Sequence, residues 1–350
     1  MDKLTRDAAL ETLESHLESV WPLFNDAANQ EIMINRHDSV WVETGGTMTR
    51  VEGCEIDPAQ LNRAITVLAN VNDKDVTASP LLDARLPGLR IAAALWPVAV
   101  HGDMMSIRKH AETRFTADDY LRLGAFDVLP PSANPRASRG DEEVLRRLAD
   151  GREAIPEFYK WAMRHGFNIL FSGGTSSAKT TQLNQIIDVM PGHDRIVTIE
   201  DTQELSVTLP NWVALEANQG VSIRDLVKFS LRIRPDRIIV GETRGAEAFD
   251  VLEALNTGHD GSVLSLHAPS SEMAPMRFES LVRMSEEGRL MTLDDLRRKI
   301  ASTFRFFVHA ERQKSGMRGP VEIREVLGVE DGRYVTRLLF HRFGGSEQTF

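Results

Sequence analysis

The chain has 350 residues, of which 42% are hydrophobic and 26% are charged, so it is long enough for two domains with buried cores. Its net charge of −10 argues against broad binding of nucleic acid or of an anionic membrane, because both reward lysine and arginine surfaces. The single cysteine, Cys54, excludes an intrachain disulfide and fits a reducing compartment. The sequence has neither a long apolar run nor a signal peptide, so we expect a cytoplasmic protein without a transmembrane segment.

Residues 1–129 predict an N-terminal α+β domain. Leucines and aromatic residues recur at helical intervals over residues 4–24, which predicts an amphipathic helix packed on its own domain. A membrane-surface helix would carry lysine and arginine on its polar face, whereas this segment is mostly acidic there. The further predicted elements are strands over Ile32–Ile34 and Val40–Val42, a helix over Pro58–Asn70, and strands over Leu89–Val100 and Met104–His110.

A linker is predicted over residues 130–140, because PPSANPRASRG is rich in proline, serine and charged or amide residues. Residues 141–350 alternate helical and apolar strand-like stretches, which is the pattern of a parallel α/β sheet. Predicted helices cover Asp141–Arg147, Pro156–His165, Ser222–Arg232 and Ala246–Asn256. Predicted strands cover Phe167–Phe171, Arg195–Ile199, Val213–Glu216, Arg237–Val240 and Ser262–Leu266.

A loop of small residues separates a predicted strand from a predicted helix in NILFSGGTSSAKTTQLNQII, residues 168–187. This is the context of a phosphate-binding P-loop, in which small residues let consecutive backbone N–H groups turn toward phosphate oxygens. Lys179 would reach the β- and γ-phosphates of a nucleotide, and the Thr180 hydroxyl would ligate Mg²⁺. The candidate nucleotide-binding residues of the loop are Gly173, Gly174, Thr175, Ser176, Ser177, Ala178, Lys179, Thr180 and Thr181.

The loop departs from the pattern G-x-x-x-x-G-K-[ST]. Gly173 occupies the first glycine, but Ala178 stands where the second is expected, and Ser176 replaces a glycine that is common in such loops. Alanine is tolerated if the backbone there has a negative φ, whereas a positive φ would cost about 1 kcal/mol or more. The alternative interpretation is an ordinary serine- and glycine-rich turn before a helix.

Acidic residues end two further predicted strands. Glu200 and Asp201 follow the apolar strand that begins at Arg195, and carboxylates at such strand ends line the ligand crevice of a parallel sheet. Glu200 or Asp201 could therefore hold Mg²⁺ through water. Glu242 follows the strand Arg237–Val240, which has the form of a Walker B strand, and is the candidate for orienting the attacking water. Each acid alone could instead be a turn residue, a helix cap or a surface ion pair.

His267 lies just past another predicted strand, where it could contact a γ-phosphate. A lone histidine is more often structural, and zinc is not expected because no cysteine or histidine pair has ligand spacing. Five arginines could neutralise charge on a transferred phosphoryl group, or could form surface ion pairs. They are Arg232, Arg234 and Arg237, which flank the Walker B-like strand, and Arg90 and Arg108, on strands of the N-terminal domain.

Four segments occur in the order SGGTSSAKTT, IEDTQEL, LRIRPDRIIVGETRG and TGHDGSVLSLHA. In this order they resemble the Walker A loop, Asp box, Walker B strand and His box of the secretion traffic ATPases of type II and type IV secretion. EIMINRHDSVWVETGG and the segment from SPLLDARLPGLRI to MSIRKH also resemble the N-terminal domain of that family. Among its members the chain is most similar to the type IV secretion and conjugal-transfer ATPases, because it is short and has no C-x-x-C pair.

The resemblance implies a PAS-like N-terminal domain and a RecA-like ATPase domain, with ATP and Mg²⁺ bound between them. It implies a homohexamer that powers inner-membrane components of a secretion, conjugation or pilus machine from the cytoplasmic face. Residue by residue, it assigns Lys179 and Thr180 to phosphate and Mg²⁺, and Glu200 to the Asp box. It assigns Glu242 as the catalytic glutamate and His267 to the γ-phosphate. Arg90 and Arg108 match N-terminal arginines of the family that contact nucleotide phosphates, and Arg234 matches an arginine of the family's R-P-D segment.

Two other functions remain open at this point. The altered loop could belong to a structural ring that binds ATP but turns it over weakly. RecA-like cores also serve nucleic-acid translocases, although direct nucleic-acid binding is not expected for a chain of this charge.

Overall fold

The computed structural model describes residues 3–110, 116–130 and 142–344. The chain divides into two compact units, Met1–Gly140 and Asp141–Phe350, which are described separately. The predicted linker, residues 130–140, lies outside the described residues except for Pro130. No helix in the described part of the chain combines the length and the apolar character needed to cross a bilayer.

The first unit is built on a six-stranded antiparallel sheet with the strand order β3-β2-β1-β6-β5-β4. Helices α1 and α3 pack on each other, and α3 begins at a cap in which Asp57 accepts from the backbone of Ala59 and Gln60. The strands are β1 Asn29–Arg36, β2 Ser39–Thr44, β3 Thr47–Arg50, β4 Leu81–Leu86, β5 Leu89–Ala94 and β6 Met104–Lys109. The helices are α1 Lys3–His16, α2 Trp21–Asn25, α3 Pro58–Val71 and α4 Ala117–Arg122.

Two predictions for this unit were wrong in their bounds, both near prolines. The predicted helix over residues 4–24 is two helices, because Pro22 is accepted in the first turn of α2 but not in a helix interior. The predicted strand Leu89–Val100 ends at Ala94, since Pro97 cannot donate to a ladder and the Trp96 N–H turns to the Asp103 carboxylate. The structure also adds β3 and β4, which were not predicted.

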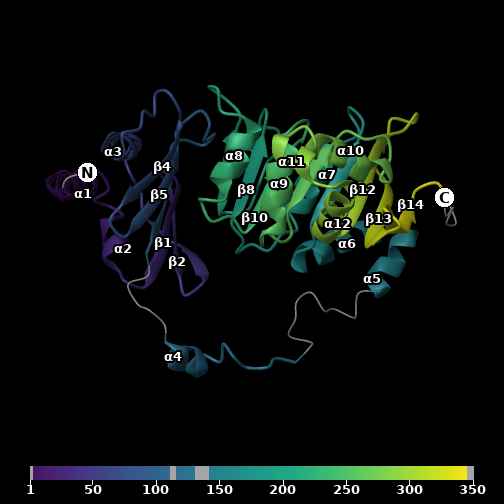
Figure 1. Ribbon diagram of the computed structural model, residues 1–350, viewed down its shortest axis with the longest axis horizontal. Helices are drawn as coiled ribbons and strands as arrows, with labels where there is room; N and C mark the ends of the chain where they lie inside the picture. The colour runs from purple at the N-terminus through teal and green to yellow at the C-terminus, as the bar shows by residue number, and fades with distance from the viewer. Residues whose placement is uncertain (1–2, 111–115, 131–141, 345–350) are drawn as a thin grey trace. The chain divides into compact units, whose positions relative to one another are not determined.

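The second unit is an eight-stranded sheet with the order β14-β13-β12-β7-β11-β10-β8-β9. The six strands from β12 to β9 in this order run parallel, so their carboxyl ends meet at one edge. Figure 1 shows β12, β13 and β14 side by side at one end of the sheet. The strands are β7 Ile169–Gly173, β8 Ile196–Glu200, β9 Trp212–Glu216, β10 Arg237–Val240, β11 Val263–Leu266, β12 Phe306–Arg312, β13 Arg318–Glu330 and β14 Arg333–His341.

The helices of this unit form two packed groups, α5 with α6 and α7, and α9 with α8, α10 and α12. They are α5 Glu142–Arg147, α6 Ala154–Arg164, α7 Lys179–Ile187, α8 Ile223–Ser230, α9 Glu247–Asn256, α10 Met273–Val282, α11 Glu286–Leu290 and α12 Leu293–Thr303, with a short 3₁₀ turn at Leu148–Asp150. Ser222 and Thr292 cap α8 and α12 by accepting from the backbone three residues on. The predicted α/β fold class and the predicted strands of this sheet are confirmed.

An aromatic cluster holds α6 to the middle of this sheet. The Phe306 side chain is fully buried and meets Phe158 edge-on, with ring centroids 4.8 Å apart. Trp161 and Phe167 contact the same ring. Such edge-to-face contacts add to the burial of a large apolar ring, so Phe306 fixes β12 beside β7.

Replacing Phe306 with alanine is therefore expected to lower the free energy of unfolding of the second unit by about 3–5 kcal/mol. Urea unfolding followed by tryptophan fluorescence measures the change. Phe343→Ala is the control, because that ring is 65% exposed and its loss is expected to cost less than about 0.5 kcal/mol. Equal losses in the two variants would contradict this account of the core.

Candidate functional site

The phosphate loop connects β7 to α7 at the carboxyl edge of the parallel sheet. Gly173 ends β7 and must be glycine, because a Cβ there would lie 2.5 Å from the Ala310 carbonyl oxygen and 2.5 Å from the Ser177 Oγ. Gly174 faces open space, and α7 begins directly at Lys179. The first N–H groups of α7 therefore face the same space as the loop.

Ser176 and Ala178 both adopt the left-handed backbone conformation, with φ of 59° and 75°. These are the two positions at which the sequence has replaced an expected glycine. For residues with a Cβ, this conformation costs roughly 1–2 kcal/mol each. Such strain persists only where the surroundings hold it, and it is concentrated at ligand-binding turns. The loop thus keeps the glycine-type backbone without two of its glycines.

Lys179 projects into the mouth of the loop. Its Nζ donates to the carbonyl oxygens of Gly173 and Gly174 at 3.0 and 3.1 Å, and lies 3.5 Å from His267 Nδ1. Burial lowers the pKa of Lys179, and the negative charge of Glu242 opposes that shift. A half-buried ammonium in this position is suited to bind the end of a polyphosphate chain.

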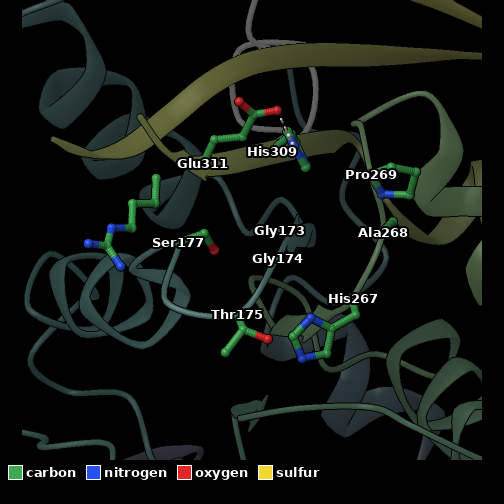
Figure 2. Close-up of a pocket in the computed structure, with 10 residues that line it drawn as sticks. Gly173, Gly174, Thr175, Ser177, His267, Ala268, Pro269, His309 and Glu311 are labelled. Atoms are coloured by element: carbon green, nitrogen blue, oxygen red, sulfur yellow. Dashed lines mark hydrogen bonds and ion pairs between the residues drawn. The ribbon is translucent and has the colours of Figure 1, made fainter. Parts of the chain in front are cut away.

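Two cavities flank the loop. The first, of about 550 Å³, is shown in Figure 2 and lies between the loop, His267 and the end of β12. The second, of about 560 Å³, lies between the loop, the ends of β8 and β10, and His267. Ser177 lines both, and its buried Oγ has no hydrogen-bond partner among the described residues. A phosphate oxygen would satisfy that hydroxyl, so the loop fits an anionic ligand.

The second cavity supplies the oxygen donors that Mg²⁺ prefers. The Thr180 hydroxyl donates to Glu204 Oε2 at 3.0 Å, and Glu200 and Asp201 line the same cavity. Among the described residues no three histidine, cysteine, aspartate or glutamate side chains are grouped as a complete metal site. This donor set fits Mg²⁺, which proteins usually hold through one or two side chains together with substrate phosphates and water.

Glu200 is a buried carboxylate at the end of β8. Its Oε1 accepts from the backbone N–H groups of Glu204 and Leu205, each at 3.0 Å. Burial raises the pKa of Glu200, and these two hydrogen bonds oppose the shift. A raised folded-state pKa means that folding favours the neutral carboxyl, so its contribution to stability is present at low pH and is lost as pH rises through that pKa.

Glu200→Gln is expected to remove this pH dependence and to retain an oxygen acceptor for the two N–H groups. The free energy of unfolding of the variant, relative to the native chain, should rise as pH increases above the ordinary glutamate pKa of about 4.3. Urea unfolding at several pH values measures the difference. The exposed Glu330→Gln serves as control and should show no such trend. A relative stability of Glu200→Gln that falls as pH rises would contradict the raised pKa.

Glu242 lies beside Glu200 and is held as a carboxylate. Its Oε1 is 2.9 Å from Arg244 Nε and 2.9 Å from His267 Nε2 in ion-pair contacts, and Oε2 accepts from Arg244 at 3.0 Å. Burial raises the pKa of Glu242, but the Arg244 hydrogen bond and the charges of His267, Arg244 and Lys179 outweigh it, so the pKa is lowered. Gly241 permits the arrangement, because a Cβ there would lie 2.8 Å from Glu200 Cγ.

The structure therefore brings together most of the residues that the sequence nominated. Those lining the second cavity are Thr175, Ser176, Ser177, Ala178, Lys179, Thr180, Thr181, Glu200, Asp201, Glu242 and His267, and Gly173 and Gly174 line the first. Sequence analysis missed Arg244 and Glu204, which also line the second cavity. Arg244 follows the Walker B-type acid by two residues, and Glu204 follows Glu200 by four, so both could have been found by their proximity to a nominated acid.

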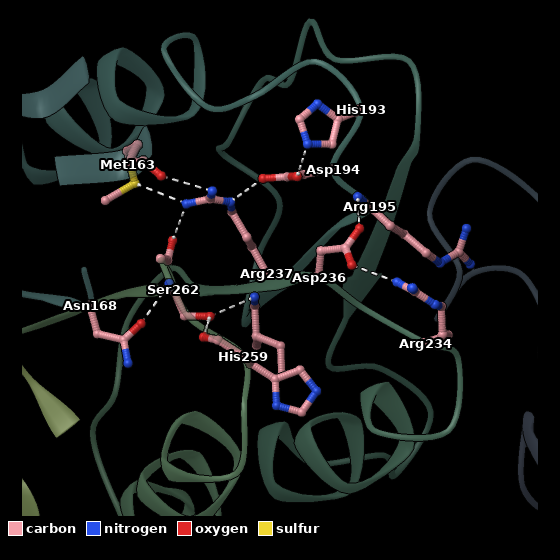
Figure 3. Close-up of polar contacts among 12 residues, drawn as sticks. Met163, Asn168, His193, Asp194, Arg195, Arg234, Asp236, Arg237, His259 and Ser262 are labelled. Atoms are coloured by element: carbon pink, nitrogen blue, oxygen red, sulfur yellow. Dashed lines mark hydrogen bonds and ion pairs between the residues drawn. The ribbon is translucent and has the colours of Figure 1, made fainter. Parts of the chain in front are cut away.

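Of the nominated arginines, Arg234 belongs to the second unit and does not line these cavities. Figure 3 shows Arg234 paired with Asp236, with 2.5 Å between Nη1 and Oδ1, at the amino end of β10. Glu242 follows the other end of that strand, so Arg234 lies at the edge of the sheet opposite the phosphate loop. Arg90 and Arg108 belong to the first unit, where they are direct neighbours across β5 and β6. Arg90 also lies 3.9 Å from Asp83.

His259 and Arg237 lie near the amino ends of the parallel strands, and their contacts are structural (Figure 3). The His259 ring lies 2.7 Å from the Ala254 carbonyl oxygen, at the end of α9. Arg237 is buried, and its Nε is 2.5 Å from Asp194 Oδ2. It also donates to the Met163 carbonyl at the end of α6 and to the Gly261 carbonyl in the turn before β11. Arg237 therefore links β10 to both elements. These contacts hold the sheet together away from the candidate site.

A phosphate loop between β7 and α7, with carboxylates at the ends of β8 and β10, defines a RecA-like P-loop ATPase fold, here with a smaller α+β domain before it. The chain belongs to the family of type II/IV secretion system proteins. The family model of that description matches residues 145–311. The resemblance seen in the sequence is therefore confirmed.

Relatives match nearly the whole chain. A Mycobacterium tuberculosis protein named for conjugal transfer is 32% identical, over 91% of this chain and 87% of the relative. The type IV secretion system protein VirB11 of Bartonella quintana is 31% identical, over 85% of this chain and 88% of the relative. The solved VirB11 ATPase of the Brucella suis type IV secretion system, in complex with sulphate, is 29% identical with a TM-score of 0.82, covering 91% of this chain and 96% of that one.

The left-handed residues of the loop can be tested directly. Ala178→Gly is expected to raise the free energy of unfolding of the second unit by about 1 kcal/mol, because glycine adopts a positive φ without a Cβ clash. Thermal unfolding measures the change. In the control, Ala301→Gly in the last turn of α12, stability should instead fall by up to about 1 kcal/mol. A loss of stability in Ala178→Gly would contradict the strained backbone.

Proposed function

We propose that this chain hydrolyses ATP to ADP and phosphate with Mg²⁺ at the second cavity. The observation that carries the proposal is the contact of Glu242 with His267, which itself lies beside Lys179 at the mouth of the phosphate loop. A carboxylate, a histidine and a lysine thus share one cavity with the start of α7. This is the set of groups that phosphoryl transfer to water needs, namely phosphate binding, charge neutralisation and positioning of the nucleophile.

Each residue has a separate role in this proposal. Backbone N–H groups from Gly174 to Thr180 bind phosphate oxygens, and Lys179 binds the β- and γ-phosphates. Thr180, with Glu200 or Asp201 through water, holds Mg²⁺, which when bound neutralises phosphate charge. Glu242, kept ionised by its cationic neighbours, orients the attacking water and accepts its proton. His267 contacts the γ-phosphate end.

We further propose that the chain acts as a homohexameric motor with inner-membrane components of a type IV secretion or conjugation machine, at the cytoplasmic face. The support is similarity along the whole chain to proteins named for type IV secretion and conjugal transfer. The assignments of Arg90 and Arg108 to nucleotide phosphates, and of Arg234 as a catalytic residue of the R-P-D segment, stay predictions from the family resemblance. Arg234 lines neither of the two cavities described above.

A structural ring with weak turnover is the second candidate, because Ser176 and Ala178 strain the loop that binds the phosphates. The two functions differ in whether Glu242 matters for turnover. A ring that merely binds ATP would release phosphate slowly, and equally slowly without that carboxylate.

Glu242→Gln is expected to slow phosphate release from Mg-ATP by about 10²–10⁴-fold, because it removes the proton acceptor but keeps the size of the side chain. Binding of Mg-ATP should persist in this variant and should be lost in Lys179→Ala. A coupled phosphate-release assay on the assembled protein measures turnover.

The exposed Glu272→Gln is the control and should turn over at the native rate. Equal rates in the native chain and Glu242→Gln would contradict the hydrolysis proposal and favour the structural ring. Strong stimulation of turnover by DNA would instead favour a nucleic-acid translocase.

A further inference from the structure

The turn between β12 and β13 carries three cations that sequence analysis did not assign. Arg312 ends β12, Arg318 begins β13, and Lys314 lies in the turn that joins them. We call these three residues the basic tip. The turn is closed by backbone hydrogen bonds, from Gln313 N to the Met317 carbonyl and from Gly316 N to the Gln313 carbonyl.

The basic tip extends from the strand that touches the phosphate loop. In the parallel ladder between β12 and β7, Ala310 is the register partner of Gly173, the first loop residue. The Ala310 carbonyl is one of the two groups that exclude any side chain from Gly173. Arg312 follows Ala310 by two residues, so its position relative to the loop is fixed by the sheet itself.

The two arginines line the two cavities of the site. Arg312 lines the first cavity, together with Gly173, Gly174 and Ser177. Arg318 lines the second, together with Lys179 and Thr180. Each of the two cavities that border the phosphate loop is therefore lined by one arginine of the basic tip.

These arginines form a like-charge pair. Arg312 and Arg318 are direct partners in the antiparallel ladder, an arrangement that is destabilising because the two positive charges repel. Neither side chain makes a hydrogen bond or ion pair with any described residue, and both are exposed. Other arginines of the same sheet are neutralised, since Arg305 and Arg337 both pair with Glu325.

The remaining cations of the second cavity are already engaged. Arg244 pairs with Glu242 and Asp201, and Lys179 donates to two loop carbonyls. The same cavity holds four carboxylates, whose negative charge opposes the binding of a polyphosphate. That set is Glu200, Asp201, Glu204 and Glu242. Arg318 of the basic tip lines this cavity and carries a positive charge that no described carboxylate neutralises.

We propose that Arg312 and Arg318 bind phosphate oxygens of the nucleotide held on the phosphate loop of the same chain. This inference rests on the proposed function and adds a phosphate-binding element from the C-terminal hairpin. The bound phosphates neutralise the repulsion between the two arginines, and the planar guanidinium groups donate to phosphate oxygens. Both residues are binding residues, and neither supplies or accepts the proton.

The test is a titration of Mg-ATP, and separately of inorganic tripolyphosphate, into the full-length native chain and its variants by calorimetry. Arg312→Gln and Arg318→Gln are each expected to weaken binding of both probes by about tenfold, and the double variant by more. The salt dependence of binding should become shallower in each variant. Arg333→Gln is the matched control. Arg333 is exposed at the turn between β13 and β14 and lines neither cavity, so this variant should bind as the native chain does.

Stability separates this role from a structural one. Removing one member of a repelling pair should leave the melting temperature without nucleotide unchanged or higher, while affinity falls. Affinities within twofold of the native chain in both single variants and in the double variant would overturn the inference. If the native chain itself binds neither Mg-ATP nor tripolyphosphate, the proposed function is contradicted, and this inference with it. A variant that melts lower and binds more weakly in proportion would assign the arginines a structural role instead. Arg312→Lys keeps the positive charge and should retain most of the affinity of the native chain.

Discussion

The site depends on a short stretch of left-handed backbone between β7 and α7. Two residues with side chains, Ser176 and Ala178, adopt positive φ there, although each would be more stable elsewhere in φ/ψ space. The conformation turns the loop around Lys179 and delivers the chain to the first turn of α7. Tight contacts on both sides hold it, because Gly173 leaves no room for a Cβ beside Ala310 and Ser177. Strain in the loop is thus supported by the packing of β12 against β7.

The parallel sheet converts this loop into a site. Strands β8 and β10 are neighbours in the sheet. Glu200 at the end of β8 and Glu242 after β10 therefore meet at the edge where the loop lies. Gly241 lets the two acids approach, because a Cβ there would clash with Glu200. Their surroundings shift the two pKa values in opposite directions. Burial raises the pKa of Glu200, whereas Arg244 and His267 lower that of Glu242. Two carboxylates on adjacent strands therefore differ in protonation, which fits the separate roles proposed for them.

Much of this arrangement was predictable, because it is local in sequence. The loop, Lys179 and the strand-end acids are read from short motifs, and the alternation of strands and helices predicts which edge they share. The sign of φ at Ala178 was not predictable, since an alanine at that position is compatible with either sign and the structure has 75°. The same holds for Arg318, which reaches the site through the β12–β13 hairpin. That hairpin and β14 were missed, although Asp331-Gly332 is a strong turn signal with both residues at positive φ.

The most direct measurement is a crystal structure of the chain with Mg²⁺ and a non-hydrolysable ATP analogue. The account predicts that backbone N–H groups between Gly174 and Thr180 lie within hydrogen-bond distance of phosphate oxygens, with Ser176 and Ala178 still at positive φ. It also predicts Glu242 within reach of the water nearest the γ-phosphate. A triphosphate bound away from the loop, or a loop that abandons its left-handed residues to bind it, would contradict the central claim.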